Sequence, residues 1–322
     1  MKALFFRVAL AAAATLTCTL GMAQGDAGDK RPVRLVVPFS AGGQLDALGR
    51  YFGEKLAASL DVPVIVDNRP GASGMIAASF VANAPADGKT IFFTTGGPVS
   101  IAPHLHKKMS YDPAADLVPV AMVADMPMTF VVRPDSPYKS MNDLLAAARA
   151  TPGKITVGNT GIGAVSHLAT ELLSQKMGVS FIQVPYQTTA TLTDLMGGQL
   201  DVLSTSATSV EKLVASNKMR PLATFTDKRL KTMNNAPTVA EVTGAQGVAF
   251  PVWLGVMVRQ GTAPAMVDKL SNALLTACAL PETTTRFTDI IVCAGPKPFA
   301  QVIQEDTARW RETITRANIK AE

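Results

Sequence analysis

The sequence lacks the features that mark several large classes of protein. It has only three cysteines and three histidines in 322 residues, and these are not spaced as zinc ligands. Its basic residues are scattered, without a dense Lys/Arg run and with little aromatic interleaving, which argues against a nucleic-acid partner. The dinucleotide fingerprint, the Walker loop and the G-x-S-x-G nucleophile elbow are missing. The sequence therefore predicts no metal and no cofactor, and it gives no support for an enzyme.

Long apolar runs are also missing, except near the N-terminus. Lys2 and Arg7 precede an apolar run over residues 8–20, and Gly21-Met22-Ala23 offers a small-x-small cleavage site. The run is short and rich in small residues for a membrane span, although an uncleaved N-terminal anchor is the alternative. We expect residues 1–23 to be a signal peptide, cleaved after Ala23, and the mature chain to be periplasmic.

Cleavage would leave two cysteines, Cys278 and Cys293. In an oxidising compartment they could form a disulfide, since their separation permits a bridge between a helix and a strand. Two buried free thiols are the alternative that the sequence leaves open.

Short β-branched runs alternate with helical periodicity along most of the chain. Residues 33–37 and 91–93 are typical of buried strands, whereas the three- and four-residue spacing of Leu45, Leu48, Phe52, Leu56 and Leu60 predicts an amphipathic helix. This alternation predicts parallel sheets with crossover helices.

The same pattern restarts in the middle of the chain, at a predicted strand over residues 130–132. Two α/β units of similar size, without a Pro/Ser-rich linker, predict two lobes joined by more than one crossing. Residues 123–131 and 250–254 are the candidate crossings. We expect an α/β fold with one lobe formed by residues 24–125 and 249–322, another by residues 126–248, and a ligand cleft between them.

Three loops combine glycine and hydroxyl side chains at the carboxyl end of a predicted strand, where open α/β sheets bind ligands. In the first, two glycines precede a helix whose unpaired N–H groups suit a carboxylate or phosphate, although a tight turn is the structural alternative. Ser166 and His167 in the third point in different directions at a helix start, which disfavours a catalytic pair. The candidate binding residues are Phe39, Ser40, Ala41, Gly42, Gly43 and Asp46, then Thr95 and Gly97, and finally Asn159, Gly161, Ala164, Val165 and Ser166.

Ordered motifs from about residue 30 onwards carry a family resemblance. They are Arg31-Pro32-Val33-Arg34-Leu35-Val36-Val37-Pro38-Phe39 with Gly42-Gly43 and Asp46, Asn68-Arg69-Pro70-Gly71-Ala72, Ala86-Asp87-Gly88, Lys107-Lys108 with Tyr111-Asp112-Pro113, Ser166-His167-Leu168, Pro185-Tyr186 with Leu192-Thr193-Asp194-Leu195 and Gly197-Gly198-Gln199-Leu200-Asp201, and Ala236-Pro237-Thr238-Val239-Ala240-Glu241. The chain resembles the substrate-binding receptors of tripartite tricarboxylate transporters, often called Bug receptors.

This resemblance implies a two-lobed, type II periplasmic-binding-protein fold that closes over its ligand. It also implies delivery to membrane permease subunits driven by an ion gradient. Known ligands of the family are small carboxylates, among them di- and tricarboxylates, acidic amino acids and aromatic acids. The family's carboxylate site corresponds here to residues 39–43, 94–99 and 159–166. We expect a monomer that binds a small carboxylate.

The sequence departs from the family pattern at places that bear on the ligand. Thr205 stands where relatives often have an Asp that could serve an ammonium group, and it is a further candidate binding residue. Ile162 and Val165 replace residues that are often polar, and Gln187 replaces a common Lys. These changes favour a non-amino organic acid with an apolar or aromatic body. An exported enzyme acting on a small acid, and a sensor that feeds a signalling kinase, are the alternative functions.

Overall fold

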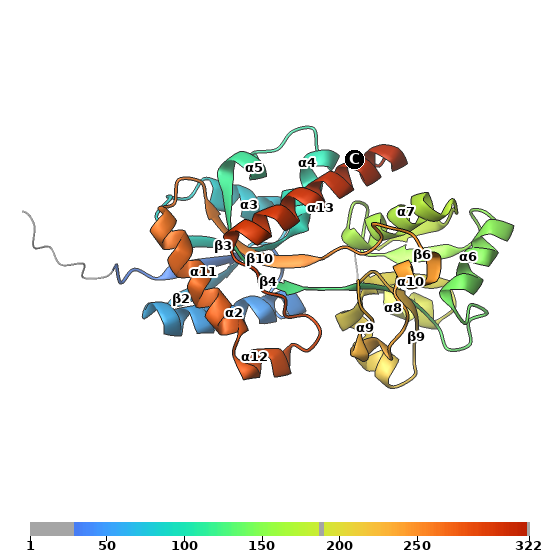
Figure 1. Cartoon of the computed structure of the whole chain (residues 1–322). Coiled ribbons are helices and arrows are strands. Elements are labelled where there is room, and N and C mark those ends of the chain that lie inside the picture. The colour runs from blue at the N-terminus through green and yellow to red at the C-terminus, as the bar shows by residue number, and fades with distance from the viewer. Residues whose placement is uncertain (1–28, 187–189, 321–322) are drawn as a thin grey trace, which may run out of the picture.

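The computed structural model describes residues 29–186 and 190–320, and Figure 1 shows two lobes with strands running between them. The expected signal peptide and its cleavage site, and Gln187, lie outside the described residues. None of the helices in the described part of the chain is both long and apolar enough to span a bilayer.

The first lobe is built on a five-stranded sheet in the order β2-β1-β3-β10-β4. The α2 stripe predicted from the sequence packs on one face, where Leu48, Phe52 and Leu56 are fully buried together with side chains of α11. Helices α3 and α13 cover the other face. The elements of this lobe are β1 (Val33–Val37), α2 (Gln44–Leu60), β2 (Val64–Asn68), η1 (Ala72–Gly74), α3 (Met75–Ala82), β3 (Thr90–Thr95), the π-helical turn η2 (Gly97–Ile101), α4 (Ala102–Leu105), α5 (Pro113–Asp116), β4 (Leu117–Asp125), β10 (Trp253–Arg259), α11 (Pro264–Cys278), α12 (Pro281–Arg286) and α13 (Pro296–Ala317).

The second lobe repeats this plan on a sheet in the order β7-β6-β8-β5-β9. Its helix α6 begins with a capping box, because Asp143 N–H donates to Ser140 Oγ and Ser140 N–H to the Asp143 carboxylate. The elements are β5 (Met128–Val132), α6 (Met141–Ala150), β6 (Thr156–Asn159), α7 (Val165–Met177), β7 (Ile182–Pro185), α8 (Ala190–Met196), β8 (Val202–Ser206), α9 (Ala207–Ala215), β9 (Arg220–Thr224), η3 (Lys231–Met233) and α10 (Val239–Thr243).

The sheets are mixed, which corrects the expectation of parallel sheets. In the first, β1 pairs in parallel with β2 and β3, but β10 is antiparallel to β3 and β4. In the second, β6 is parallel to β7 and β8, and β5 is antiparallel to β8 and β9. The antiparallel strands, β10 and β5, are the ones that enter each lobe from the other, so crossover helices do not set their direction.

Two crossings lie against each other where the lobes meet. The chain passes from β4 to β5 through Met126 and returns through Val252 into β10. Met126 N–H donates to Val252 O at 2.9 Å, and Val252 N–H donates to Asp125 Oδ1 at 2.8 Å. These bonds fasten the two crossings into one hinge.

Helix α13 joins the lobes a third time. Near its start Phe299 packs in the first lobe, whereas Trp310 and Ile314 near its end belong to the core of the second. The Trp310 ring lies 5.0 Å from that of Phe250, and Gln175 of α7 donates to Thr313 O. In Figure 1 the helix runs from the first lobe towards α7. Movement between the lobes must therefore accommodate α13.

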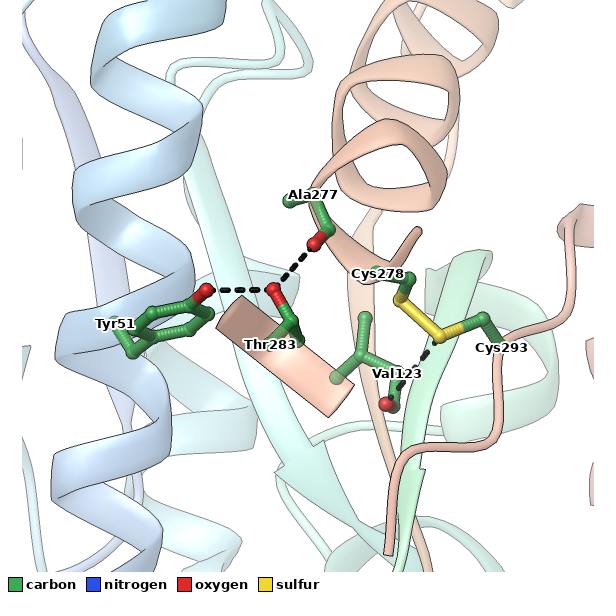
Figure 2. Close-up of a disulfide and its surroundings, with 6 residues drawn as sticks. All are labelled: Tyr51, Val123, Ala277, Cys278, Thr283 and Cys293. Carbon is green, nitrogen blue, oxygen red and sulfur yellow. Dashed lines mark hydrogen bonds between the residues drawn. A yellow bond between two sulfur atoms is a disulfide. The ribbon is translucent and has the colours of Figure 1, made fainter. Parts of the chain in front are cut away.

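Cys278 and Cys293 form a disulfide in the first lobe, which Figure 2 shows. Cys278 ends α11, and Cys293 precedes an isolated bridge between Ala294 and Met122 of β4. Nearby, Tyr51 of α2 donates to Thr283 Oγ1, which donates to Ala277 O at 2.6 Å. The bridge therefore fastens the end of α11 to the segment that pairs with β4.

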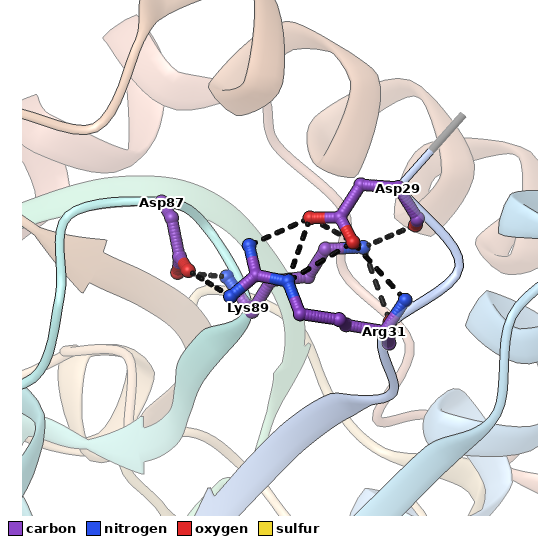
Figure 3. A network of polar contacts seen from close by, with 4 residues as sticks. All are labelled: Asp29, Arg31, Asp87 and Lys89. Carbon is purple, nitrogen blue, oxygen red and sulfur yellow. Dashed lines mark hydrogen bonds and ion pairs between the residues drawn. The ribbon is translucent and has the colours of Figure 1, made fainter. Parts of the chain in front are cut away.

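Charged residues tie the start of the described chain to the loop before β3 (Figure 3). Arg31 donates to both carboxylate oxygens of Asp29 and lies 3.0 Å from Asp87 Oδ2. Lys89 Nζ donates to Asp29 O at 2.8 Å. Because Arg31 donates to it, the pKa of Asp29 is lowered to about 2. The network holds β1 and β3 together at the end opposite the cleft-facing loops.

Candidate functional site

A cavity of about 720 Å³ lies between the lobes. Both lobes contribute to its wall, and Met126 and Val252 of the hinge lie in it as well. The remaining lining residues are Pro38, Phe39, Ser40, Leu45, Pro70, Gly71, Ser73, Gly74, Thr95, Gly97, Ile101, Ala102, Leu105 and His106 from the first lobe, and Met128, Thr160, Ile162, Gly163, Ala164, Val165, Ser166, Thr205, Ser206 and Ser209 from the second.

The Asp46 side chain fixes the conformation of the loop between β1 and α2. The Asp46 carboxylate is 3% exposed and accepts from Gly42 N–H, Arg50 and Asn68 at 2.8–2.9 Å. Asn68 also donates to Phe39 O. Arg50, by donating to it, lowers the pKa of Asp46 to about 2, so the carboxylate stays ionised. Asp46 therefore shapes the loop and presents Phe39 and Ser40 to the cavity.

The loop after β3 enters the π-helical turn η2. Gly97 N–H donates to Thr95 Oγ1 at 3.4 Å, and both residues line the cavity. Tyr111 donates its hydroxyl hydrogen to Pro98 O at 2.6 Å and thereby fixes the turn from the side of α5. Burial raises the pKa of Tyr111, which keeps this donor protonated.

The loop between β6 and α7 is closed by its own side chains. Asn159 is fully buried, accepts from Gly161 N–H at 3.0 Å and donates to Gln183. Ser166 Oγ accepts from Thr160 N–H at 3.0 Å, and His167 Nδ1 accepts from Gly163 N–H at 3.1 Å. His167 thus bonds the loop backbone instead of activating Ser166, and burial lowers its pKa. A Ser–His catalytic pair is not formed.

The end of β8 adds a group of hydroxyls. Thr205 is 8% exposed and lines the cavity beside Ser206 and Ser209. Ser206 Oγ lies 2.8 Å from Ser209 Oγ, which places the two hydroxyls together at the first turn of α9. These groups can donate to a carboxylate without bringing a formal charge.

Three helix N-termini face the cavity without a side-chain cap. They are α2 after Gly43, α7 after Ala164 and α9 after Ser206, and their first turns contribute Leu45, Val165, Ser166 and Ser209 to the wall. Uncapped N–H groups carry a partial positive charge that stabilises an anion by about 0.3–1 kcal/mol per helix, and by up to about 2 kcal/mol when partly buried. In α2 the ionised Asp46 of the first turn offsets part of this charge.

Apart from Ser73, Thr160 and His106, most of the remaining wall is apolar. Leu45, Ile101, Leu105, Met128 and Val165 line it, and Ile162 is 54% exposed at its edge. Among the described lining residues there is no Asp, Glu, Lys or Arg. An anion here would meet backbone dipoles, hydroxyls and one histidine, His106, and its carbon skeleton would meet hydrocarbon.

The structure brings together eight of the candidate binding residues. Phe39, Ser40, Thr95, Gly97, Ala164, Val165, Ser166 and Thr205 line the cavity. Ala41, Gly42, Gly43, Asp46, Asn159 and Gly161 lie in the same loops but not in the lining, and several of them hold the loops in shape.

Part of the wall was not predicted from the sequence. Ser206 and Ser209 carried a signal, because they extend the hydroxyl run at the end of β8, but α9 was not predicted. Leu105 and His106 carried none, since they end and directly follow a helix of four residues with no motif of its own. Met126, Met128 and Val252 reach the cavity only because both crossings pass beneath it.

Comparison with known proteins decides the family. The pattern of the tripartite tricarboxylate transporter family receptor matches residues 48–319. The chain belongs to this receptor family. BugT of Bordetella pertussis (strain Tohama I) is 30% identical over 319 residues, which cover 97% of this chain and 98% of BugT.

Solved structures of receptors agree in fold. R. palustris Rpa4515 with adipate has a TM-score of 0.79 at 32% identity and covers 91% of this chain and 99% of its own. MatC (Rpa3494) from Rhodopseudomonas palustris with bound malate has a TM-score of 0.74 at 28% identity, covering 89% and 100% respectively. The two-lobed periplasmic-binding-protein fold and the recognition of the family from sequence motifs are confirmed.

Proposed function

We propose that this receptor captures a small organic carboxylate with an apolar aliphatic or aromatic body and delivers it to the permease subunits of a tripartite tricarboxylate transporter. The observation that carries the proposal is the cavity between the lobes, where hydroxyls and uncapped helix N-termini meet an apolar wall. Relatives solved with adipate and malate support a carboxylate as the ligand.

We further propose that residues 1–23 are removed on export to the periplasm and that the mature chain acts as a monomer. Residues 24–125 and 249–322 would form one lobe and residues 126–248 the other. The eight lining candidates would contact the ligand, and the six others would shape the loops. Binding without turnover is supported by His167, whose Nδ1 accepts from Gly163 N–H and not from Ser166.

The mechanism follows from where the lining residues sit. A carboxylate would first bind Ser40, Thr95 and the loop backbones of the first lobe. The second lobe would then close and add the hydroxyls near Thr205 and the first turns of α7 and α9. Closure is favoured only by contacts that the ligand makes better in the closed state. The closed shape would dock on the permease.

Calorimetric titration of the mature chain with adipate, malate, benzoate and aspartate tests the ligand class. We expect adipate or benzoate to bind more tightly than aspartate and to be recovered unchanged. At 100 times its Kd, the bound acid should stabilise the fold by about 2.7 kcal/mol in a thermal-shift assay. Tight binding of aspartate alone would contradict the ligand class, and chemical conversion of the acid would favour an exported enzyme.

Thr205 offers a sharper test, because it lies in the wall where a carboxylate would repel the ligand. Thr205→Asp should weaken binding of adipate or benzoate by at least about tenfold, since like charges brought together in an interface cost several kcal/mol. Thr205→Ser keeps the hydroxyl and is the control, with affinity close to the wild type. Equal affinity of the Asp and Ser variants would remove β8 from the site.

A further inference from the structure

His106 is the one described lining residue whose side chain can carry a charge near neutral pH. It directly follows α4, and its N–H donates to Ala102 O at 3.0 Å, so the helix fixes where its backbone lies. The imidazole is half-buried and has no hydrogen bond or ion pair with any residue that the structure describes. Its ring nitrogens are available to a ligand.

The other two histidines are not available in this way. His167 Nδ1 accepts from Gly163 N–H. Burial lowers the pKa of His104, and Arg311 of α13 lowers it further. Both therefore favour the neutral form and lie outside the lining, which leaves His106 as the group that could balance a charge inside the cleft.

The charge balance of the cleft depends on how many carboxylates the ligand carries. Helix N-termini and hydroxyls offer partial charges and O–H groups to a carboxylate but no full positive charge, so each additional anionic group is less well balanced. A second carboxylate taken out of water without a cationic partner loses its hydration uncompensated. The apolar wall formed by Leu105, Ile162 and Val165 offers such a group nothing.

We propose that His106 is the specificity residue that admits dicarboxylate dianions, by pairing in its protonated form with the second carboxylate. The inference rests on the proposed function. With His106 neutral, the cleft prefers a monocarboxylate, and with His106 protonated it also retains a dianion. Since histidine changes charge between about pH 5 and 8, the receptor selects between these two classes of acid according to pH.

The charged groups around His106 do not supply this selection themselves. Lys107 and Lys108 follow it in the chain but are exposed and outside the lining. On α13, Arg311 acts on His104, and across the cleft Glu171 acts on His167. None of them lines the cavity, so each acts on a bound dianion only from outside it.

Calorimetry with adipate and hexanoate tests the proposal, because the two acids share a six-carbon chain and differ by one carboxylate. The mature protein is titrated at pH 6 and pH 8. For the wild type we expect adipate to bind about fivefold more tightly at pH 6, the size of a partly exposed ion pair, and hexanoate to bind equally at both. His106→Gln should remove this pH dependence of adipate binding. Any dependence that remains in the variant measures the contribution of adipate's own protonation.

Two variants keep the test decisive. Lys107→Gln removes a neighbouring charge outside the cavity and should behave as the wild type. His106→Lys keeps a positive charge at both pH values and should bind adipate at pH 8 about as well as at pH 6.

The outcomes separate the inference from the proposed function. If no acid of the panel binds, the proposed function fails and this inference with it. If adipate binds His106→Gln as tightly as the wild type at pH 6, or if Lys107→Gln reproduces the loss, the inference fails and the function stands. Adipate failing to bind at pH 6 while another acid binds would overturn it too, because protonated His106 would not have retained a dianion.

Discussion

The contact of Gly163 with Leu105 across the cleft provides a direct test of lobe closure. Gly163 lies in the loop before α7 at φ +75°, and a Cβ added there would lie 2.3 Å from Leu105 Cδ1. An ordinary carbon–carbon contact is about 3.5–4.0 Å, so the Leu105 side chain would have to move by more than about 1 Å. Gly163→Ala therefore overpacks the place where the lobes touch.

The expected cost has two parts that different measurements separate. The positive φ costs an alanine about 1–2 kcal/mol at any angle between the lobes, and this cost lowers the free energy of unfolding. Overpacking costs about 1–3 kcal/mol, and because Leu105 can rotate we expect the lower half of this range. This second part is present only when the lobes meet, so it should raise the Kd of a bound acid about tenfold.

Calorimetry on a double-mutant cycle checks this reasoning. Leu105→Ala removes the atoms that clash, so adding Gly163→Ala to it should leave affinity almost unchanged, with a coupling of about 1.4 kcal/mol between the two positions. Gly178→Ala is the matched control, because Gly178 has φ +62° with no atom within 4 Å of the added Cβ. It should lose stability but keep its affinity. A wild-type Kd in Gly163→Ala, or an equal loss with and without Leu105, would refute closure through this contact.

Two further predictions concern stability. The disulfide closes a loop with a sequence separation of 15, so replacing Cys278 and Cys293 by serine should lower the free energy of unfolding by about 3 kcal/mol in denaturant titrations. Ligand affinity should not change, and a variant as stable as the wild type would refute the constraint. Burial raises the pKa of Asp306 to about 6, so the folded chain keeps a proton that the unfolded chain releases above about pH 4. The stability that Asp306 contributes is therefore fully present below about pH 4 and is lost as the pH rises through about 6. Asp306→Asn should reduce the fall in the free energy of unfolding between pH 4 and pH 7, measured by urea titration. An unchanged slope would count against it.

The elements with strong periodicity were predictable from the sequence. The stripe of α2 gave its helix because Leu48, Phe52 and Leu56 all face one buried surface. Two strands were missed or only partly seen, β4 and β9, and each contains a proline, Pro119 and Pro221. Both are edge strands, where proline is tolerated because its missing N–H faces no partner. The pattern of a central strand therefore could not reveal them.

The loops that form the candidate site were predictable from the sequence, but the individual residues that line the cavity were not. Strand ends followed by glycines and hydroxyls located Ser40, Thr95 and Ser166, because β-strand topology places such ends at one edge. The sequence could not reveal that the Asp46 side chain bonds Arg50 and Asn68 instead of lining the cavity. Nor could it place Leu105 against Gly163, since that contact depends on how the lobes pack.

The floor of the cavity is the hinge itself, and this links ligand binding to the angle between the lobes. Met126 and Val252 line the cavity and are bonded to each other across the two crossings. A ligand resting on them also touches loops of both lobes, so it gains its full set of contacts only at one lobe angle. Because α13 packs Phe299 in one lobe and Trp310 in the other, it restricts the angles available to the chain. Binding energy can therefore select one lobe arrangement without rebuilding either lobe, and Leu105 and Gly163 are positions where the two lobes approach each other closely in this structure.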